Sequence, residues 1–167
     1  MDTILLIIIG VLSRLMPHPA NVTAVGALAV FSGSRYSTTK ALAITVGTML
    51  ISDMVLGFHS VMWATYGSFA LSVLLARHFL RKQSMIRIIG VTFASSILFY
   101  LVTNFAVWVI PGSMYPKTLA GLLDSYIMAL PFFRNSLVGD FSYSAIFFGG
   151  YELVTLFNRR LKVIFEH

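Results

Sequence analysis

Long apolar runs separated by short polar stretches account for most of this 167-residue chain. The pattern predicts helices over residues 3–15, 21–33, 40–57, 61–79, 85–110 and 136–158. A helix needs about 20 apolar residues to cross the roughly 30 Å of hydrocarbon in a bilayer. Six helices with short connections use nearly the whole chain, so we expect an all-α integral membrane protein. The expected fold is a six-helix transmembrane bundle, with residues 1–167 forming a single transmembrane domain.

The composition supports this prediction. Apolar residues make up 57% of the chain and charged residues only 11%, and the mean hydropathy is +0.85. Soluble domains are ordinarily about 45–50% apolar and about 25% charged. A soluble fold of this size could not bury so much apolar surface, so we expect the lipid bilayer to surround it. The N-terminal run lacks a basic start and a small-residue cleavage site, which predicts a retained helix and not a signal peptide.

The first two predicted helices are shorter than a standard span. Pro17 and Pro19 prevent the chain from continuing as a helix there, and the segment 21–33 is rich in Ala and Gly. We expect this pair to stand upright, to be locally broken, or to enter and leave the membrane together. Each alternative leaves the sidedness of the later helices unchanged.

The segment 118–133 is apolar enough to be a seventh crossing, but it carries Asp124. Pro116 suits the start of a helix, and Pro131 is expected to end it. Asn135 is then a candidate N-cap for the last helix.

The basic residues indicate how the chain is oriented in the membrane. With six spans, nine of them fall on one side: Arg35, Lys40, Arg77, Arg81, Lys82, Arg87, Arg159, Arg160 and Lys162. Only three fall on the other: Arg14, Lys117 and Arg134. Cytoplasmic loops carry an excess of Lys and Arg, so we expect both termini on the cytoplasmic side of the inner (cytoplasmic) cell membrane.

A seventh crossing would move the C-terminal basic cluster to the outside. The segment 118–133 is therefore predicted to be an interfacial or re-entrant helix on the outer face, before the last span. The basic residues lie in short clusters between apolar runs, as expected of loops between membrane helices. Their placement argues against nucleic-acid binding despite the formal charge of +6.

Motifs of enzymatic and ATP-driven chemistry are missing from the sequence. It contains no G-x-x-x-x-G-K-[ST], no G-x-S-x-G, no H-E-x-x-H and no Cys. We therefore predict that the protein is not an enzyme and uses no cofactor and no metal. Any ATP-driven step must come from partner proteins.

Two carboxylates stand out because a charge at the centre of a spanning helix costs about 2.5–3.5 kcal/mol. Asp53 lies about one turn below the outer end of its predicted helix. It is expected either to line a binding site or to cap a neighbouring helix or pair with Lys117 or Arg134. Asp140 lies just inside the last helix, where a ligand role competes with a favourable interaction with that helix's own dipole.

The outer ends of the predicted helices also hold polar and aromatic side chains that could line a pocket for a flat organic ligand. Asn104 and Trp108 lie one turn apart on one helix face, although Asn104 could simply bridge two helices. The aromatics could equally form an interfacial belt, and the loop histidines could simply be solvated. The candidate substrate-binding residues are Asp53, Asn104, Trp108, Asn21, His18, His59, Trp63, Tyr66, Tyr115, Lys117, Tyr126 and Asp140.

The chain resembles an uncharacterised family of small membrane proteins through the strings R-L-M-P-H-P-A-N-V-T-A-V-G-A-L-A-V-F-S-G, I-S-D-M-V-L-G-F-H, T-N-F-A-V-W, Y-P-K-T-L-A-G-L-L and A-L-P-F-F-R-N-S-L-V-G-D. That family is often grouped with the S components, the substrate-binding subunits of energy-coupling-factor transporters. The expected architecture, with short helices and a long outer connection, is similar to theirs.

The resemblance implies capture of a small nutrient, such as a vitamin, from outside the cell. It also implies a membrane coupling subunit and ATPases as possible partners. In S components a small-residue patch on the first helix meets the coupling subunit, and residues 3–15 have no such patch here. Ala20, Ala24 and Ala27 could supply a similar close-packing face. The departure leaves open another partner, or action alone.

A substrate-binding transport component is therefore the leading hypothesis. An accessory or assembly subunit without a ligand is the first alternative, and it predicts polar residues paired among themselves with no cavity. An intramembrane enzyme is the second alternative, and it lacks a nucleophile and base at workable spacing.

Overall fold

The structure is a computed structural model that describes the backbone of residues 2–165 and the side chains of residues 2–160. The described chain is all-helical and contains no strand. Its helices are α1 (Thr3–Leu15), α2 (Val25–Arg35), α3 (Thr38–Leu56), α4 (Met62–Phe79), α5 (Met85–Val109), α6 (Leu119–Met128) and α7 (Leu130–Phe165).

Short polar side chains begin several of these helices. The Asp2 carboxylate accepts a hydrogen bond from the backbone N–H of Ile4, and Ser37, Ser84 and Thr118 cap α3, α5 and α6 in the same way. Such caps satisfy backbone donors that have no partner within the helix. The caps therefore explain why these helices begin where they do.

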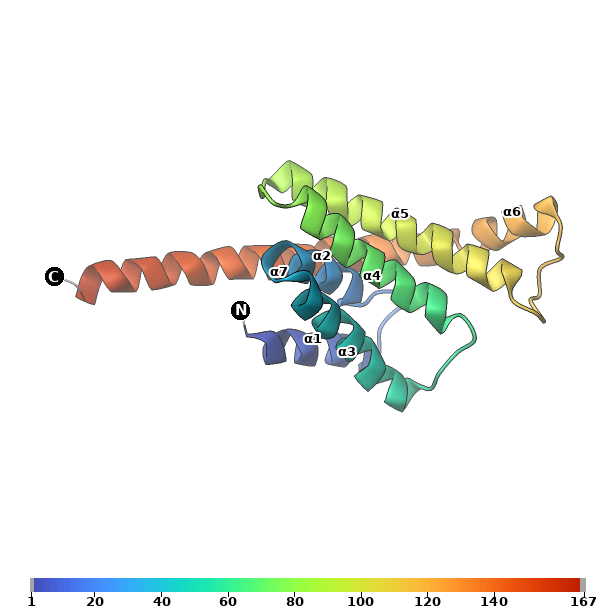
Figure 1. Ribbon diagram of the computed structural model, residues 1–167, viewed down its shortest axis with the longest axis horizontal. Coiled ribbons are helices and arrows are strands. Elements are labelled where there is room, and N and C mark those ends of the chain that lie inside the picture. The colour runs from blue at the N-terminus through green and yellow to red at the C-terminus, as the bar shows by residue number, and fades with distance from the viewer. Residues whose placement is uncertain (1, 166–167) are drawn as a thin grey trace.

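The helices run back and forth along one axis of the molecule (Figure 1). Helices α1, α3 and α5 run away from the end at which both termini lie, and α2, α4 and α7 return to it. The short helix α6 lies at the opposite end, beside the end of α5. Helix α7 has 36 residues and extends well past the other helices at the terminal end.

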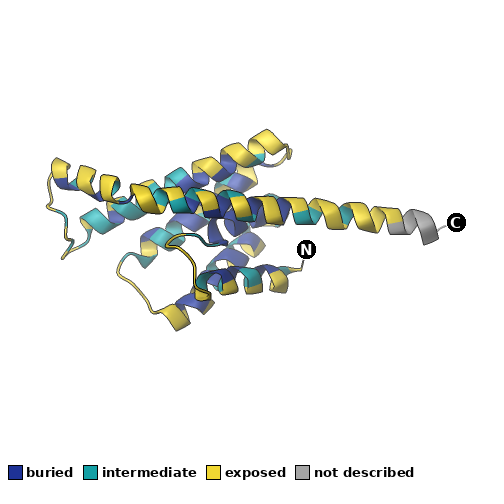
Figure 2. Cartoon of the chain, turned by 180° about the vertical axis from the view of Figure 1, so that it is seen from behind, coloured by how far each residue is buried: buried dark blue, intermediate teal, exposed yellow. Residues whose placement is uncertain are grey.

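Helix α2 is the centre of the bundle. It contacts α1, α3, α4, α5 and α7, and all of its residues from Val25 to Gly33 are buried. Figure 2 shows that buried residues gather in the middle of the molecule, where the helices cross. Small residues allow its neighbours to approach closely, because a side chain at Gly33 would overlap the backbone of Val73 in α4.

The prediction was accurate for four helices and inaccurate for the other two. Helix α1 spans 3–15 as predicted, and the ends of α3, α4 and α5 lie within two residues of the predicted ones. Helix α2 begins four residues later than predicted, because the chain remains irregular through Asn21, whose φ is 66°. Asn tolerates this left-handed conformation better than most residues.

The predicted end of the outer helix at Pro131 is wrong, and so is the N-cap assigned to Asn135. Helix α7 already begins at Leu130, with Pro131 in its first turn. Proline is tolerated there because its missing N–H would have no partner within the helix. Asn135 lies inside α7, and its side-chain amide donates to the backbone carbonyl of Ala20 at 3.0 Å.

The molecule is apolar outside and rich in hydroxyl groups inside. Large side chains such as Met54, Val55 and Ile86 are more than two-thirds exposed, whereas many Ser and Thr side chains are buried. The buried hydroxyl residues are Ser13, Ser32, Thr45, Thr48, Ser52, Ser68, Ser72, Thr92, Ser95, Ser96, Ser125, Ser136 and Ser144. Within the described residues, α3 and α5 are long and apolar enough to cross a membrane.

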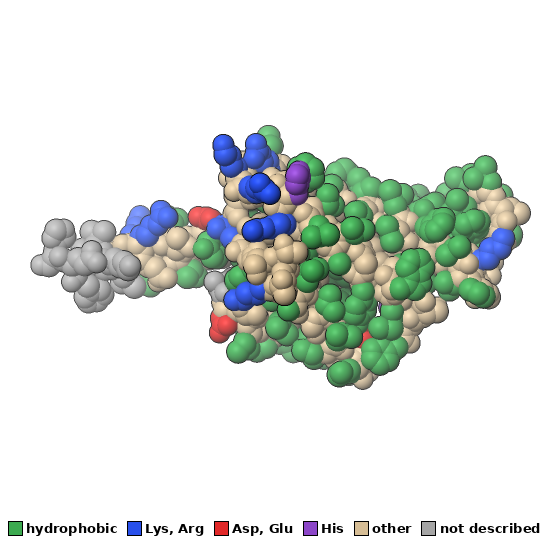
Figure 3. Space-filling model, viewed as in Figure 1, with side chains coloured by type: hydrophobic (Ala, Val, Ile, Leu, Met, Phe, Trp, Pro, Cys, Tyr) green, Lys and Arg blue, Asp and Glu red, His purple; other side chains and the backbone are tan. Residues whose placement is uncertain are grey.

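Basic side chains gather at the end of the bundle where the termini lie (Figure 3). They belong to the ends of α2, α3, α4, α5 and α7 nearest the termini and to the α4–α5 connection: Arg35, Lys40, Arg77, Arg81, Lys82, Arg87, Arg159 and Arg160. The side chain of Lys162, which the predicted cluster includes, lies outside the described residues. Apolar side chains dominate the middle of the face that Figure 3 shows.

Candidate functional site

The connection between α1 and α2 lies part-way along the bundle and not at the end opposite the termini (Figure 1). With 13 and 11 residues, these helices are only about 20 Å and about 16 Å long at 1.5 Å per residue. The irregular segment 16–24 therefore lies closer to the terminal end of the bundle than the α3–α4 and α5–α6 connections do. Exposed polar backbone at such a depth is tolerated in a membrane only beside protein or a water-filled cavity.

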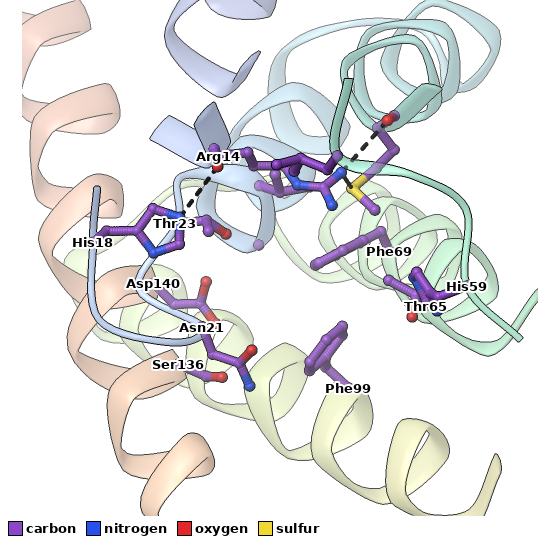
Figure 4. Close-up of a pocket in the computed structure, with 14 residues that line it drawn as sticks. Arg14, His18, Asn21, Thr23, His59, Thr65, Phe69, Phe99, Ser136 and Asp140 are labelled. Atoms are coloured by element: carbon purple, nitrogen blue, oxygen red, sulfur yellow. Dashed lines mark hydrogen bonds between the residues drawn. The ribbon is translucent and has the colours of Figure 1, made fainter. Parts of the chain in front are cut away.

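A cavity of about 440 Å³, called the main cavity below, lies beside this segment. Figure 4 shows Thr23, Asp140, Asn21 and Ser136 on one side of it, with Phe69 and Phe99 facing them from the other. The two phenyl rings are stacked, with centroids 5.0 Å apart. The cavity thus has one polar wall and one aromatic wall. Its full lining is Arg14, His18, Asn21, Thr23, Val25, Gly26, Met49, Leu56, His59, Thr65, Phe69, Phe99, Ser136 and Asp140.

A second cavity of about 270 Å³ adjoins the first, because Asn21, Phe99 and Ser136 line both. Asn104 and Tyr115 lie in its wall. The Asn104 amide donates to the Tyr100 carbonyl at 2.7 Å, and its side-chain oxygen forms no hydrogen bond within the described residues. Three of the predicted candidates, Asn21, Asn104 and Tyr115, therefore line this second cavity.

Arg14 and Asp53 form a buried ion pair at the edge of the main cavity. Arg14 Nη2 lies 2.6 Å from Asp53 Oδ1, and the Tyr66 hydroxyl donates to Asp53 Oδ2 at 2.7 Å. Arg14 Nη1 also donates to Ser52 Oγ at 2.8 Å. Arg14 lines the cavity, whereas Asp53 is only 1% exposed and lies behind it. Pairing is thus what the structure shows for Asp53, and its partner is Arg14, neither Lys117 nor Arg134.

Asp140 caps a helix other than its own. Its carboxylate accepts hydrogen bonds from the Ser96 hydroxyl at 2.6 Å and from the backbone N–H of Ala27, in the first turn of α2. The predicted interaction with the start of its own helix is not present, because α7 begins ten residues earlier, at Leu130. A side chain at Gly26 would overlap Asp140 Oδ1, so the absence of one leaves room for the carboxylate.

The two predicted loop histidines both line the main cavity. The ring nitrogens of His18 lie 2.8 Å from the Pro19 carbonyl and 3.4 Å from the Arg14 carbonyl. No group of three His, Asp or Glu side chains among the described residues is placed to hold a metal ion.

Several aromatic candidates and Lys117 lie outside both cavities. The Trp108 indole donates to the Pro116 carbonyl at 2.9 Å, and Lys117 Nζ contacts the carbonyls of Trp108 and Ile110. These bonds tie the α5–α6 connection to the end of α5. The Tyr126 hydroxyl donates to the Leu101 carbonyl, the Tyr66 hydroxyl holds Asp53, and Trp63 is 57% exposed.

The alanine face suggested for a partner subunit is not available as a surface. Ala24 and Ala27 are fully buried in the core around α2, and only Ala20 is exposed. A partner contact of these three residues would require the core to open.

Sequence reasoning missed Arg14, Thr23, Gly26, Phe69, Phe99 and Ser136, all of which line the main cavity. A signal existed only for Arg14, one of the three basic residues predicted on the outer side. The phenylalanines and small polar residues resemble many others in the chain.

Comparison with known proteins places the chain in one family. No curated protein and no solved structure matches it. One family model matches residues 1–163, which is nearly the whole chain. The chain therefore belongs to the family described as "Family of unknown function (DUF6580)".

Proposed function

We propose that the chain is a six-pass membrane protein built from α1, α2, α3, α4, α5 and α7, with α6 at the outer interface. The short helices α1 and α2 meet beside the cavity instead of reaching the outer surface. The proposal is supported by the exposed apolar side chains and the buried hydroxyls, the reverse of the usual soluble arrangement. The basic side chains at one end favour placing that end, and both termini with it, in the cytoplasm.

Within this topology, the protein is a substrate-binding component for the uptake of a small nutrient, such as a vitamin or cofactor-like molecule. One observation carries the proposal: two adjoining cavities of about 440 and 270 Å³ lie in the outer half of the bundle. Small-molecule sites are typically concave spaces of about 300–1,000 Å³, with apolar walls and a few polar groups. An accessory subunit without a ligand would have no need for such a space.

The energy for uptake comes from partner proteins or from a ligand gradient, because the sequence has no phosphate-binding loop. A coupling subunit with its ATPases is the partner class that the family resemblance implies. Ala24 and Ala27 are buried, so such a partner would contact a different surface of the bundle.

The test is mass spectrometry of the small molecules released by heat from the gently purified protein, compared with an aliquot denatured before the final purification step. We expect one compound at a stoichiometric amount in the folded sample only. The absence of any bound compound after growth in several media would contradict the proposal and favour an accessory subunit.

A further inference from the structure

The main cavity is lined by a carboxylate, Asp140, that forms no ion pair with a basic side chain of the described chain. Among the described residues the ion pairs are Arg14–Asp53 and Arg35–Glu152. The charge of Arg14 is therefore matched by Asp53. Asp140 lines the same cavity and has no Lys or Arg within ion-pair distance.

Two hydrogen-bond donors contact the carboxylate of Asp140. The Ser96 hydroxyl and the Ala27 N–H both donate to its carboxylate, and the start of α2 places the positive end of a helix dipole there. Two donors leave part of its acceptor capacity unused, since a carboxylate accepts at about four positions. Asp140 also lines the cavity and is 9% exposed, and Figure 4 draws its side chain at the edge of that space.

The opposite wall of the cavity consists of aromatic rings. Phe69 and Phe99 are stacked and face Asp140 across the space that Figure 4 shows. Aromatic faces attract both flat apolar groups and cations. A ligand that carries a cationic nitrogen on a flat ring system would satisfy both walls.

We propose that Asp140 binds a cationic group of the ligand, a protonated amine or amidine, while the flat part of the same molecule lies against Phe69 and Phe99. The inference rests on the proposed substrate-binding function and narrows its substrate class to organic cations. A free alkali cation shares the charge that Asp140 recognises, but it would leave the aromatic wall without a role.

The experiment compares the compounds released from wild-type protein, Asp140→Asn and Asp124→Asn, purified in parallel. Asp124 is an exposed carboxylate on α6 outside both cavities, so Asp124→Asn makes the same chemical change without touching the site. We expect wild type and Asp124→Asn to release the same compound, retained on a cation exchanger at pH 7. Asp140→Asn should retain roughly 10- to 100-fold less of it, the usual effect of losing a hydrogen bond to a charged group.

A released compound that is neutral or anionic, or that Asp140→Asn still binds fully, would overturn the cation proposal and leave the binding function intact. No compound from any of the three proteins would count against the binding function itself, and against this inference with it.

Two measurements on wild-type protein avoid reliance on the folding of Asp140→Asn. Dialysis against benzamidine, a flat cation, should displace the bound compound, whereas benzamide, its neutral counterpart, should not. Equal displacement by both would overturn the proposal. The second measurement applies if the protein releases no organic compound. A melting temperature that rises with sodium chloride but not with N-methylglucamine chloride would then indicate that Asp140 binds an alkali cation. That result would overturn the proposal of an organic cation.

Discussion

Arg14 Nη2 lies 2.6 Å from Asp53 Oδ1, and this contact joins the end of α1 to the last turn of α3. Because Tyr66 donates to the other carboxylate oxygen, one buried group connects three helices. Asp53 therefore holds Arg14 in place at the cavity wall but does not itself line the cavity.

We therefore expect Asp53→Ala to destabilise the protein. Removing one partner of a buried pair leaves the other charge uncompensated, which costs about 3–5 kcal/mol. The value should fall toward the lower limit, because the Arg14 side chain is 15% exposed. Thermal unfolding in detergent measures the effect, and Arg14→Met combined with Asp53→Leu should recover much of the loss. A single Asp53→Ala variant as stable as wild type would show that the pair contributes little.

Gly26→Ala is expected to displace Asp140, because the added methyl would overlap its carboxylate. The variant should lose both the cap on α2 and the bound compound. Gly47→Ala is a matched control, since nothing lies within 4 Å of the added methyl, and alanine favours a helix over glycine by up to about 1 kcal/mol. Melting temperature and compound content report on both variants. Normal binding by Gly26→Ala would mean that Asp140 can move without consequence.

Asn104→Ala is expected to reduce the bound compound while leaving the melting temperature nearly unchanged. The residue lines the second cavity and its amide bonds only to the carbonyl one turn earlier in α5, so the helix loses no long-range contact. Asn158→Ala, at an exposed position of α7, is the control. Full binding by Asn104→Ala would restrict the site to the larger cavity.

Lys117→Met is expected to lower the melting temperature slightly and to leave binding intact. Lys117 contacts the last carbonyls of α5, where a positive charge complements the helix dipole. Loss of the compound in this variant would instead support the ligand role predicted from the sequence.

The absence of cysteine from the sequence makes the proposed topology directly testable. Single cysteines at Ser60 and Met114 should react with a membrane-impermeant maleimide added to intact cells. A cysteine at Gln83 should react only after the cells are opened. Labelling of all three positions from the outside would contradict the six-pass arrangement.

The sequence allowed most helices to be located, because apolar runs bounded by prolines, glycines and caps are local signals. It also named Asn21, His18, His59 and Asp140, which the structure brings together around one cavity. Their role in binding a substrate stays a prediction.

Other features depend on contacts between distant segments, for which a single sequence carries no signal. The partner of Asp53 is 39 positions earlier in the chain, and Asp140 caps α2 from the last helix. The start of α7 was misplaced for a different reason: proline ends a helix when it lies inside it but is accommodated in a first turn, and sequence alone did not distinguish the two cases.

The central position of α2 has a consequence for how the protein is made. The N–H groups at its start donate to Ser13 of α1 and to Asp140 of α7. During synthesis the ribosome therefore releases α2 long before the carboxylate that completes its start exists. The nascent chain must hold an unfinished helix among its neighbours until α7 emerges, so the start of α2 gains its remaining partner only after α7 has joined the bundle.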